Sequence, residues 1–306
     1  MVREDVLDTA PAGSDPLRRI TLVANPATRG DIDHLVAIIR AEAPPECEID
    51  LLSTTSPGEA VELAAAAAPT ADIVVAIGGD GTVSDVATGL LGHRAALGII
   101  PAGSTNIVAR ELRIPRQPRG AARLLFGPHR VRLIDVGICN GHCFLHMAGA
   151  GIDSHFFARA SPDLKRRLGW LAYLPPAIEA LRLDPVRFTI SADGHRTVLD
   201  SPFVLVANGS SVITPAWRLV PGVRQDDGWL DLLVFSAATP AAKAATLARL
   251  ATFGLNRSVY LLRTKARRIE IDADPRLPLQ LDGDVRAKMP ALIEILPKAV
   301  AVIGPR

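Results

Sequence analysis

Short apolar runs alternate with segments of helical periodicity over the first 130 residues. The runs are rich in β-branched residues and too short to be helices, which is typical of strands buried on both faces of a sheet. They lie at residues 19–24, 47–52, 73–77 and 97–100. Helices are predicted between them, at residues 31–42, 60–68, 83–90, 107–112 and 120–126. This repeated strand–turn–helix order predicts a doubly wound parallel sheet with right-handed crossovers.

The pattern changes near Arg130, where strand-like segments replace the helical periods. They lie at residues 131–139, 143–148, 187–191, 197–199, 203–207, 230–235 and 268–272. Asn-Gly and Asp-Gly pairs, which favour tight hairpin turns, stand between several of them, at residues 140–141, 193–194 and 227–228. The second half is therefore predicted to be a mainly antiparallel β-domain, with helices at 162–183 and 240–253.

Candidate chemistry begins where the third apolar run ends. Residues 78–82 read Gly-Gly-Asp-Gly-Thr, between a predicted strand and a predicted helix. Glycines let a phosphate approach the backbone closely, and a helix N-terminus offers N–H groups and a positive dipole end. Asp80 is unusual there, because a carboxylate repels phosphate unless it holds a metal ion or accepts a proton. The alternative for Asp80 is a helix cap in an ordinary turn.

Other polar loops follow the first, second and fourth predicted strands. Residues 25–30 read Asn-Pro-Ala-Thr-Arg-Gly, and residues 101–106 read Pro-Ala-Gly-Ser-Thr-Asn. Open α/β sheets bind ligands at the carboxyl ends of their strands, so these loops are expected to share one crevice and to bind a nucleotide. An ordinary loop is an equal alternative for residues 25–30, and helix capping is the default for the hydroxyls at 54–56.

Composition narrows the class of protein. The 306 residues are 48% hydrophobic and 22% charged with a net charge of +2, which is typical of a globular chain and too small a charge to argue for nucleic acid. Three cysteines fit a reducing compartment. No apolar stretch reaches the roughly 18–20 residues of a spanning helix. Residues 1–16 are interpreted as a disordered lead rather than a signal peptide. We expect a cytoplasmic protein with only peripheral membrane contact.

Together the motifs resemble the diacylglycerol kinase catalytic-domain family of lipid kinases, which includes bacterial diacylglycerol kinases and the sphingosine and ceramide kinases. The motifs that carry the resemblance are NPATRG at residue 25, TTSPGEA at 54, GGDGT at 78, PAGSTNIVARELRIP at 101, AGAGIDS at 148, KRRLGWLAY at 165, VANG at 206, PGVRQDDGWLDLLVF at 221 and LQLDGD at 279. The resemblance implies an α/β nucleotide-binding domain at 17–130, to which residues 290–306 return. It also implies a β-sandwich lipid-substrate domain at 131–289.

The resemblance further implies transfer of the γ-phosphoryl group of ATP to a lipid hydroxyl, with Mg²⁺. The residues that it places at ATP are Asn25, Pro26, Ala27, Thr28, Arg29, Thr54, Gly78, Gly79, Asp80, Gly81, Thr82, Ser104 and Asn106. The proton acceptor is either Asp80 or Asp284, which stands where the family usually has Glu. A structural Mg²⁺ is implied at the side chain of Asp227 and the main-chain oxygens of Arg224 and Trp229.

Partners and competing functions follow from the same residues. The lipid is expected to be met at a membrane surface, where Lys165, Arg166 and Arg167 beside Trp170 and Tyr173 could contact anionic headgroups. A solvated basic helix face is the alternative, and a homodimer stays open. Two other functions stay open as well: an NAD kinase-like phosphotransferase acting on a soluble acceptor, and a non-catalytic protein that binds a nucleotide or a lipid.

Overall fold

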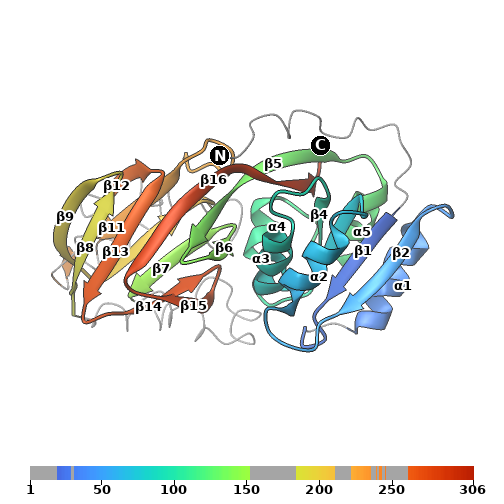
Figure 1. The fold of residues 1–306 in the computed structure, drawn as a ribbon, viewed down its shortest axis with the longest axis horizontal. Coiled ribbons are helices and arrows are strands. Elements are labelled where there is room, and N and C mark those ends of the chain that lie inside the picture. The colour runs from blue at the N-terminus through green and yellow to red at the C-terminus, as the bar shows by residue number, and fades with distance from the viewer. Residues whose placement is uncertain are drawn as a thin grey trace. The chain divides into compact units, whose positions relative to one another are not determined.

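The computed structural model describes residues 19–28, 31–151, 184–210, 222–235, 239, 241–242, 245 and 261–306 (Figure 1). The predicted helix at 162–183 with its basic cluster, most of the predicted helix at 240–253, Arg29 and residues 1–16 lie outside these ranges. The described chain divides into two compact units, residues 19–134 with 299–306 and residues 135–298. It passes between them within β5 (Arg130–Cys139) and again within β16 (Ala291–Gly304).

The first unit is built on the parallel sheet that the apolar runs predict. Its strands lie in the order β2 (Glu48–Ser53), β1 (Arg19–Ala24), β3 (Ile73–Gly78) and β4 (Ala96–Pro101), all parallel. The C-terminal end of β16 adds a further parallel strand beside β4, with Val302 opposite Leu97. Every residue of β3 and β4 is buried, as expected for strands covered on both faces. The predicted doubly wound sheet is therefore confirmed.

Helices connect these strands. They are α1 (Ile32–Glu42), α2 (Glu59–Ala67), α3 (Asp80–Gly89), α4 (Ile107–Glu111) and α5 (Pro118–Phe126). The Asp31 carboxylate caps α1 by accepting the N–H groups of Asp33 and His34. Helix α3 begins three residues before the predicted position, because residues 80–82 form its first turn but carry no large apolar side chain that periodicity could detect. Asp80 therefore stands in the first turn of a helix rather than in the loop before it.

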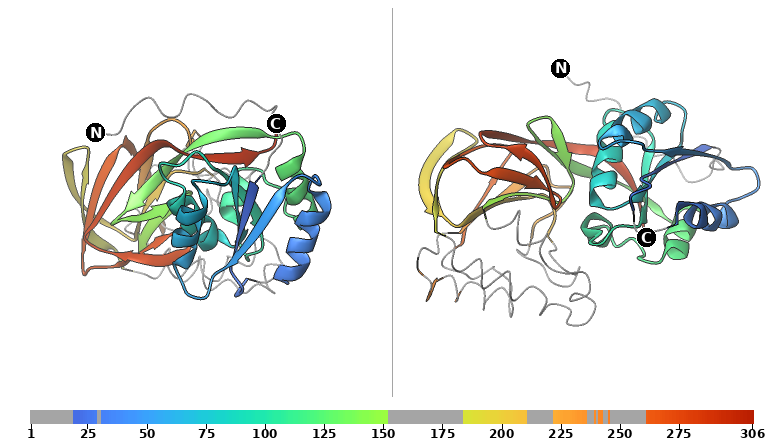
Figure 2. Two further views of the ribbon diagram at one scale, coloured as in Figure 1. Left: turned by 45° about the vertical axis from the view of Figure 1, so that its right-hand side comes forward. Right: turned by 90° about the horizontal axis from the view of Figure 1, so that it is seen from below.

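The second unit consists of antiparallel strands in two sheets. One sheet has the order β12 (Leu261–Ala266), β11 (Leu230–Phe235), β10 (Phe203–Ala207), β7 (Met147–Gly151), β14 (Pro278–Leu281) and β15 (Asp284–Lys288). The other contains β16, β13 (Arg268–Asp274), β8 (Val186–Ala192) and β9 (His195–Ser201), and β6 (His142–Phe144) pairs with β5. Figures 1 and 2 show both layers.

A single apolar core joins the two sheets of this unit. Phe188 and Ile269 from one sheet pack with Val204, Leu230 and Leu279 from the other. Two antiparallel sheets that share one core form a β-sandwich, so this prediction is confirmed as well. Among the residues that the structure describes, no helix is both long enough and apolar enough to cross a membrane.

One predicted strand of this unit is wrong. Residues 143–148 were expected to form a continuous strand, but β6 ends at Phe144 and β7 starts at Met147. The N–H groups of residues 145–147 are donated to the Asp282 carboxylate rather than to a neighbouring strand. A side chain distant in the sequence therefore interrupts the ladder.

Candidate functional site

Two glycine loops touch through their backbones at the carboxyl edge of the parallel sheet. They follow the adjacent strands β3 and β4, whose last residues, Gly78 and Pro101, pair in register. A Cβ atom added to Gly103 would lie 2.5 Å from the Cα atom of Gly79. No side chain fits at that distance, so the contact requires glycine at residue 103. The sequence predicts that these loops open at one edge, and the structure brings them into direct contact.

Asp80 connects these two loops. It is the first residue of α3, only 9% exposed, and its Oδ1 accepts the N–H of Val108 at 3.0 Å. Val108 lies in the first turn of α4, so Asp80 satisfies an N–H at the start of a neighbouring helix. The N-cap residue of α4, Asn106, has φ 47° and bonds the N–H and the carbonyl of Gly103 instead. Asp80 therefore fixes the geometry of the site besides any chemical role.

The loop after β1 joins the same cluster. The side-chain amide of Asn25 donates to Thr82 Oγ1 at 3.4 Å, and Thr28 Oγ1 donates to the carbonyl of Ala102 at 2.7 Å. The backbone N–H of Thr54 donates to the carbonyl of Ala24 at 2.9 Å. Ser104 is exposed in the loop after β4. The structure thus gathers the predicted nucleotide-binding residues of the first unit, apart from Arg29, which lies outside the described residues.

The second unit carries the other proton-acceptor candidate, Asp284. It is the first residue of β15, and its side chain is 61% exposed. The guanidinium of Arg286 lies 3.7 Å from Asp284 Oδ2, which is a loose ion pair. An exposed carboxylate of this kind is accessible to a substrate hydroxyl.

Asp282, two residues earlier, has a role that sequence reasoning missed. Its carboxylate is almost fully buried and accepts three backbone N–H groups, from Leu145 at 2.7 Å, His146 at 2.8 Å and Met147 at 2.9 Å. Its own N–H donates to the carbonyl of Met147 at 2.9 Å. Asp282 precedes Gly283, and an Asp before a turn glycine is a sequence signal for the left-handed backbone conformation. The φ angle of Asp282 is 51°, which lies in that region. Its hydrogen-bond partners, residues 145–147, are distant in the sequence, so no local pattern predicts them.

Buried amides complete this anchor. The carbonyl of Leu145 accepts the side-chain amides of Asn208 at 2.9 Å and Gln225 at 2.8 Å. The N–H of Gly283 donates to Gln280 Oε1 at 2.6 Å. The turn that carries Asp284 is therefore fixed on both sides by hydrogen bonds.

The turn at residues 224–229 does not fit the magnesium ion that the resemblance implies. Asp227 Oδ1 accepts the N–H of Trp229 at 3.1 Å, and Asp227 Oδ2 forms an ion pair with the Lys265 ammonium. Asp226 is paired with Arg224 at 2.9 Å, which holds the pKa of that guanidinium above its usual range. The carboxylate predicted to bind Mg²⁺ already has a cation beside it.

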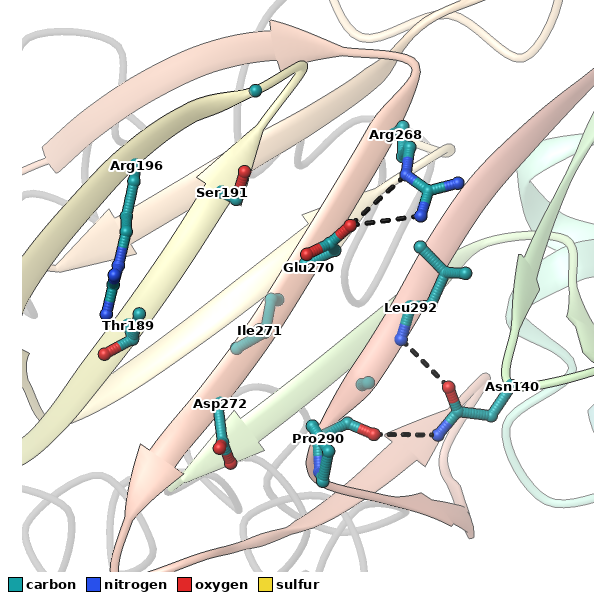
Figure 3. Close-up of a pocket in the computed structure, with 12 residues that line it drawn as sticks. Asn140, Thr189, Ser191, Arg196, Arg268, Glu270, Ile271, Asp272, Pro290 and Leu292 are labelled. Carbon is teal, nitrogen blue, oxygen red and sulfur yellow. Dashed lines mark hydrogen bonds and ion pairs between the residues drawn. The ribbon is translucent and has the colours of Figure 1, made fainter.

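A separate pocket of about 680 Å³ lies over β13, β8 and β9 of the second unit (Figure 3). Asn140 bonds the backbone at its rim, accepting from Leu292 and donating to Pro290, and Arg268 is paired with Glu270 and Glu294. The pocket contains none of the predicted site residues. We assign it no ligand.

Comparison with known families identifies the class of protein. Residues 19–139 match the family described as the diacylglycerol kinase catalytic domain. Residues 146–304 match the YegS C-terminal NAD kinase beta sandwich-like domain. The two matches correspond to the parallel sheet with its glycine loops and to the antiparallel sandwich, and they define a kinase of this two-part type.

Individual relatives make the assignment more specific. The chain is 31% identical to the diacylglycerol kinase of Bacillus subtilis (strain 168) over 302 residues, which cover 95% of this chain and 97% of the relative. It is 34% identical over 218 residues to the "Probable lipid kinase YegS-like" of Pseudomonas aeruginosa (strain UCBPP-PA14), covering 69% of each. A crystal structure from Bacillus anthracis str. Sterne, assigned as a diacylglycerol kinase, superposes with a TM-score of 0.79 at 26% identity, covering 95% of this chain and 98% of that one. The chain belongs to the diacylglycerol kinase family of lipid kinases.

Proposed function

We propose that this chain is an ATP-dependent lipid kinase, which transfers the γ-phosphoryl group of ATP to the hydroxyl of a lipid such as diacylglycerol. The observation that supports this best is the backbone contact between Gly79 and Gly103, with Asp80 beside it in the first turn of α3. Two glycine loops and a helix N-terminus give N–H groups that suit a polyphosphate. Phosphoryl transfer depends mainly on such positioning and on charge neutralisation.

The residues of the first unit would bind the nucleotide. Asn25, Thr28 and Thr82 offer amide and hydroxyl groups beside the glycine loops, and α3 directs its N-terminus toward the phosphates. Mg²⁺, bound with ATP, would supply the positive charge that offsets the phosphate oxygens. This ion is distinct from the structural ion considered at residues 224–229, through which no step of the proposal runs.

A carboxylate would accept the proton of the lipid hydroxyl. Asp284 is the exposed candidate, and its carboxylate is only loosely paired with Arg286. Asp80 is the buried candidate and is already bonded to Val108. We favour Asp284 as the proton acceptor, because a base must reach the proton that it removes. Asp80 would organise the phosphate loops and would also use its negative charge to hold the Mg²⁺ bound with ATP, a role that an asparagine at this position would lose.

The acceptor is proposed to be a lipid because relatives carry the names diacylglycerol kinase and lipid kinase. Diacylglycerol, phosphatidylglycerol and sphingoid bases all present a hydroxyl on an apolar body. Such an acceptor would be met at a membrane surface, by peripheral contact.

The test is transfer of label from γ-labelled ATP, with Mg²⁺, into a panel of these lipids in mixed micelles. Labelled lipid from the wild type, but not from Asp80→Asn, supports the proposal. Asp33→Asn, which changes an exposed carboxylate on α1, is the matched control and should keep full activity. Labelled NADP from added NAD, without labelled lipid, would instead indicate an NAD kinase-like enzyme. Bound ATP without any labelled product would indicate a binding protein.

A further inference from the structure

The turn between Arg224 and Trp229 carries positive side chains beside three carboxylates, those of Asp226, Asp227 and the fully buried Asp135, whose Oδ2 accepts the N–H of Gly228 at 2.7 Å. Arg224 is paired with Asp226, and the Arg267 guanidinium lies 4.6 Å from the centroid of the Trp229 ring. The Lys265 ammonium is the third, paired with Asp227. A divalent cation placed at this turn would compete with Arg224 and Lys265 for the carboxylates of Asp226 and Asp227, in a partly buried setting where charges are weakly screened.

Lys265 is directed to Asp227 by the fold. It lies on β12, opposite Asp231 on β11 in the antiparallel ladder. The Asp231 carboxylate is fully buried, and its Oδ1 bonds Arg263 Nε at 2.6 Å. Lys265 reaches Asp227 instead, whose side chain is only 20% exposed, and its own side chain is 39% exposed. The pair is therefore partly shielded from water.

The carboxylate of Asp227 uses both of its oxygens within the protein. Oδ1 accepts the N–H of Trp229, which closes the turn that leads into β11, and Oδ2 pairs with Lys265. A structural cation at this carboxylate would therefore have to share it with the Trp229 N–H and the Lys265 ammonium. An ammonium supplies the same sign of charge without requiring further oxygen ligands.

We infer that the Lys265 ammonium is the resident counter-ion of Asp227, and that the turn at 224–229 is stabilised without a divalent metal ion. Lys265 lies on β12, so its ion pair with Asp227 links the turn to that strand. The inference concerns stability and does not depend on the proposed function.

Thermal unfolding of the nucleotide-free protein, in EDTA or in millimolar MgCl₂, tests it. Wild type should have the same Tm in both buffers. Lys265→Met should lower the Tm in EDTA by a few degrees, and MgCl₂ should restore part of the loss, because the partly buried carboxylate of Asp227 then lacks its cation. Lys288→Met changes an exposed lysine on β15 and is the matched control, which should match wild type in both buffers.

Asp227→Asn separates this turn from any other metal site. A wild-type Tm that rises in MgCl₂ by an amount that Asp227→Asn abolishes would overturn the inference. So would a Lys265→Met protein with an unchanged Tm in EDTA. If Lys265→Met does not fold, Mn²⁺ binding to nucleotide-free wild type and to Asp227→Asn can be measured by electron paramagnetic resonance. The same number of bound Mn²⁺ ions in both proteins supports the inference. One bound ion fewer in Asp227→Asn refutes it.

Discussion

Asp282 should contribute far more to stability than its neighbour Asp284. Its Oδ1 accepts two N–H groups and its Oδ2 accepts one, all from the buried segment 145–147. Asp282→Asn leaves one side-chain oxygen. In the better amide orientation this oxygen keeps the bonds from His146 and Met147, but the amide NH₂ group then faces the N–H of Leu145, which loses its acceptor. A hydrogen bond to a charged acceptor contributes about 1.5–3 kcal/mol, and a stranded buried donor costs about 1–3 kcal/mol. We therefore expect Asp282→Asn to lower the free energy of unfolding by roughly 3–6 kcal/mol.

Urea unfolding followed by circular dichroism measures this difference. Asp284→Asn is the matched control, because it makes the same chemical change two residues away on a side chain that is 61% exposed and loosely paired. Its cost should stay below about 1 kcal/mol. Since single domains have only about 5–15 kcal/mol of stability, the first variant should show a large fall in urea midpoint. An Asp282→Asn midpoint indistinguishable from that of Asp284→Asn would refute the reasoning, since residues 145–147 would then have adequate partners elsewhere.

Three further predictions concern the site and the core. Asp80→Asn should abolish phosphoryl transfer. It should cost less than about 1.5 kcal/mol of stability, because an amide oxygen can still accept the Val108 N–H. Near-normal turnover in the label-transfer assay would exclude a catalytic or metal-binding role for Asp80. Asp284→Glu should keep or raise turnover if that side chain is the base, and a large fall in kcat would mean that the site is built around the shorter acid. Burial raises the pKa of the Cys139 thiol to about 12, so between about pH 8.5 and that value the unfolded chain loses a proton that the folded chain keeps. Urea midpoints of wild type should fall with pH in this range more steeply than those of Cys139→Ala, and parallel slopes would contradict the assignment.

The first unit was predictable because its topology follows from local patterns. Continuous apolar runs indicated strands buried on both faces, and β3 and β4 are buried at every residue. Parallel order then placed every loop that follows a strand at one edge of the sheet, which is why the candidate nucleotide site could be anticipated. The contact between Gly79 and Gly103 could not be, because it depends on how two loops approach each other within a few tenths of an ångström.

The second unit was less predictable because many of its strands lack an apolar pattern. In β12 four consecutive residues are exposed, and Ala266 is the first fully buried residue of the strand. Such a strand has little burial signal of its own and is fixed by its pairing with β11. Strands β14 and β15 have only four and five residues, which is too short for a clear alternating pattern, so the sequence did not indicate them. Here the ladder partners determine the structure, and those partners are distant in the sequence.

The Leu-Asp-Gly-Asp motif at residues 281–284 shows why sequence alone assigns roles incompletely. Both acids look equivalent in the sequence, and the resemblance gives a chemical role only to the second. The fold gives them opposite environments, because the first is buried against N–H groups 135–137 residues away and the second is exposed on β15. A buried carboxylate saturated with N–H donors can hold the backbone rigid but cannot reach a substrate, whereas an exposed one can accept a proton only if its backbone is held in place. The proton transfer that we propose for Asp284 therefore depends on Asp282, because the bonds of Asp282 to residues 145–147 hold the turn that presents Asp284.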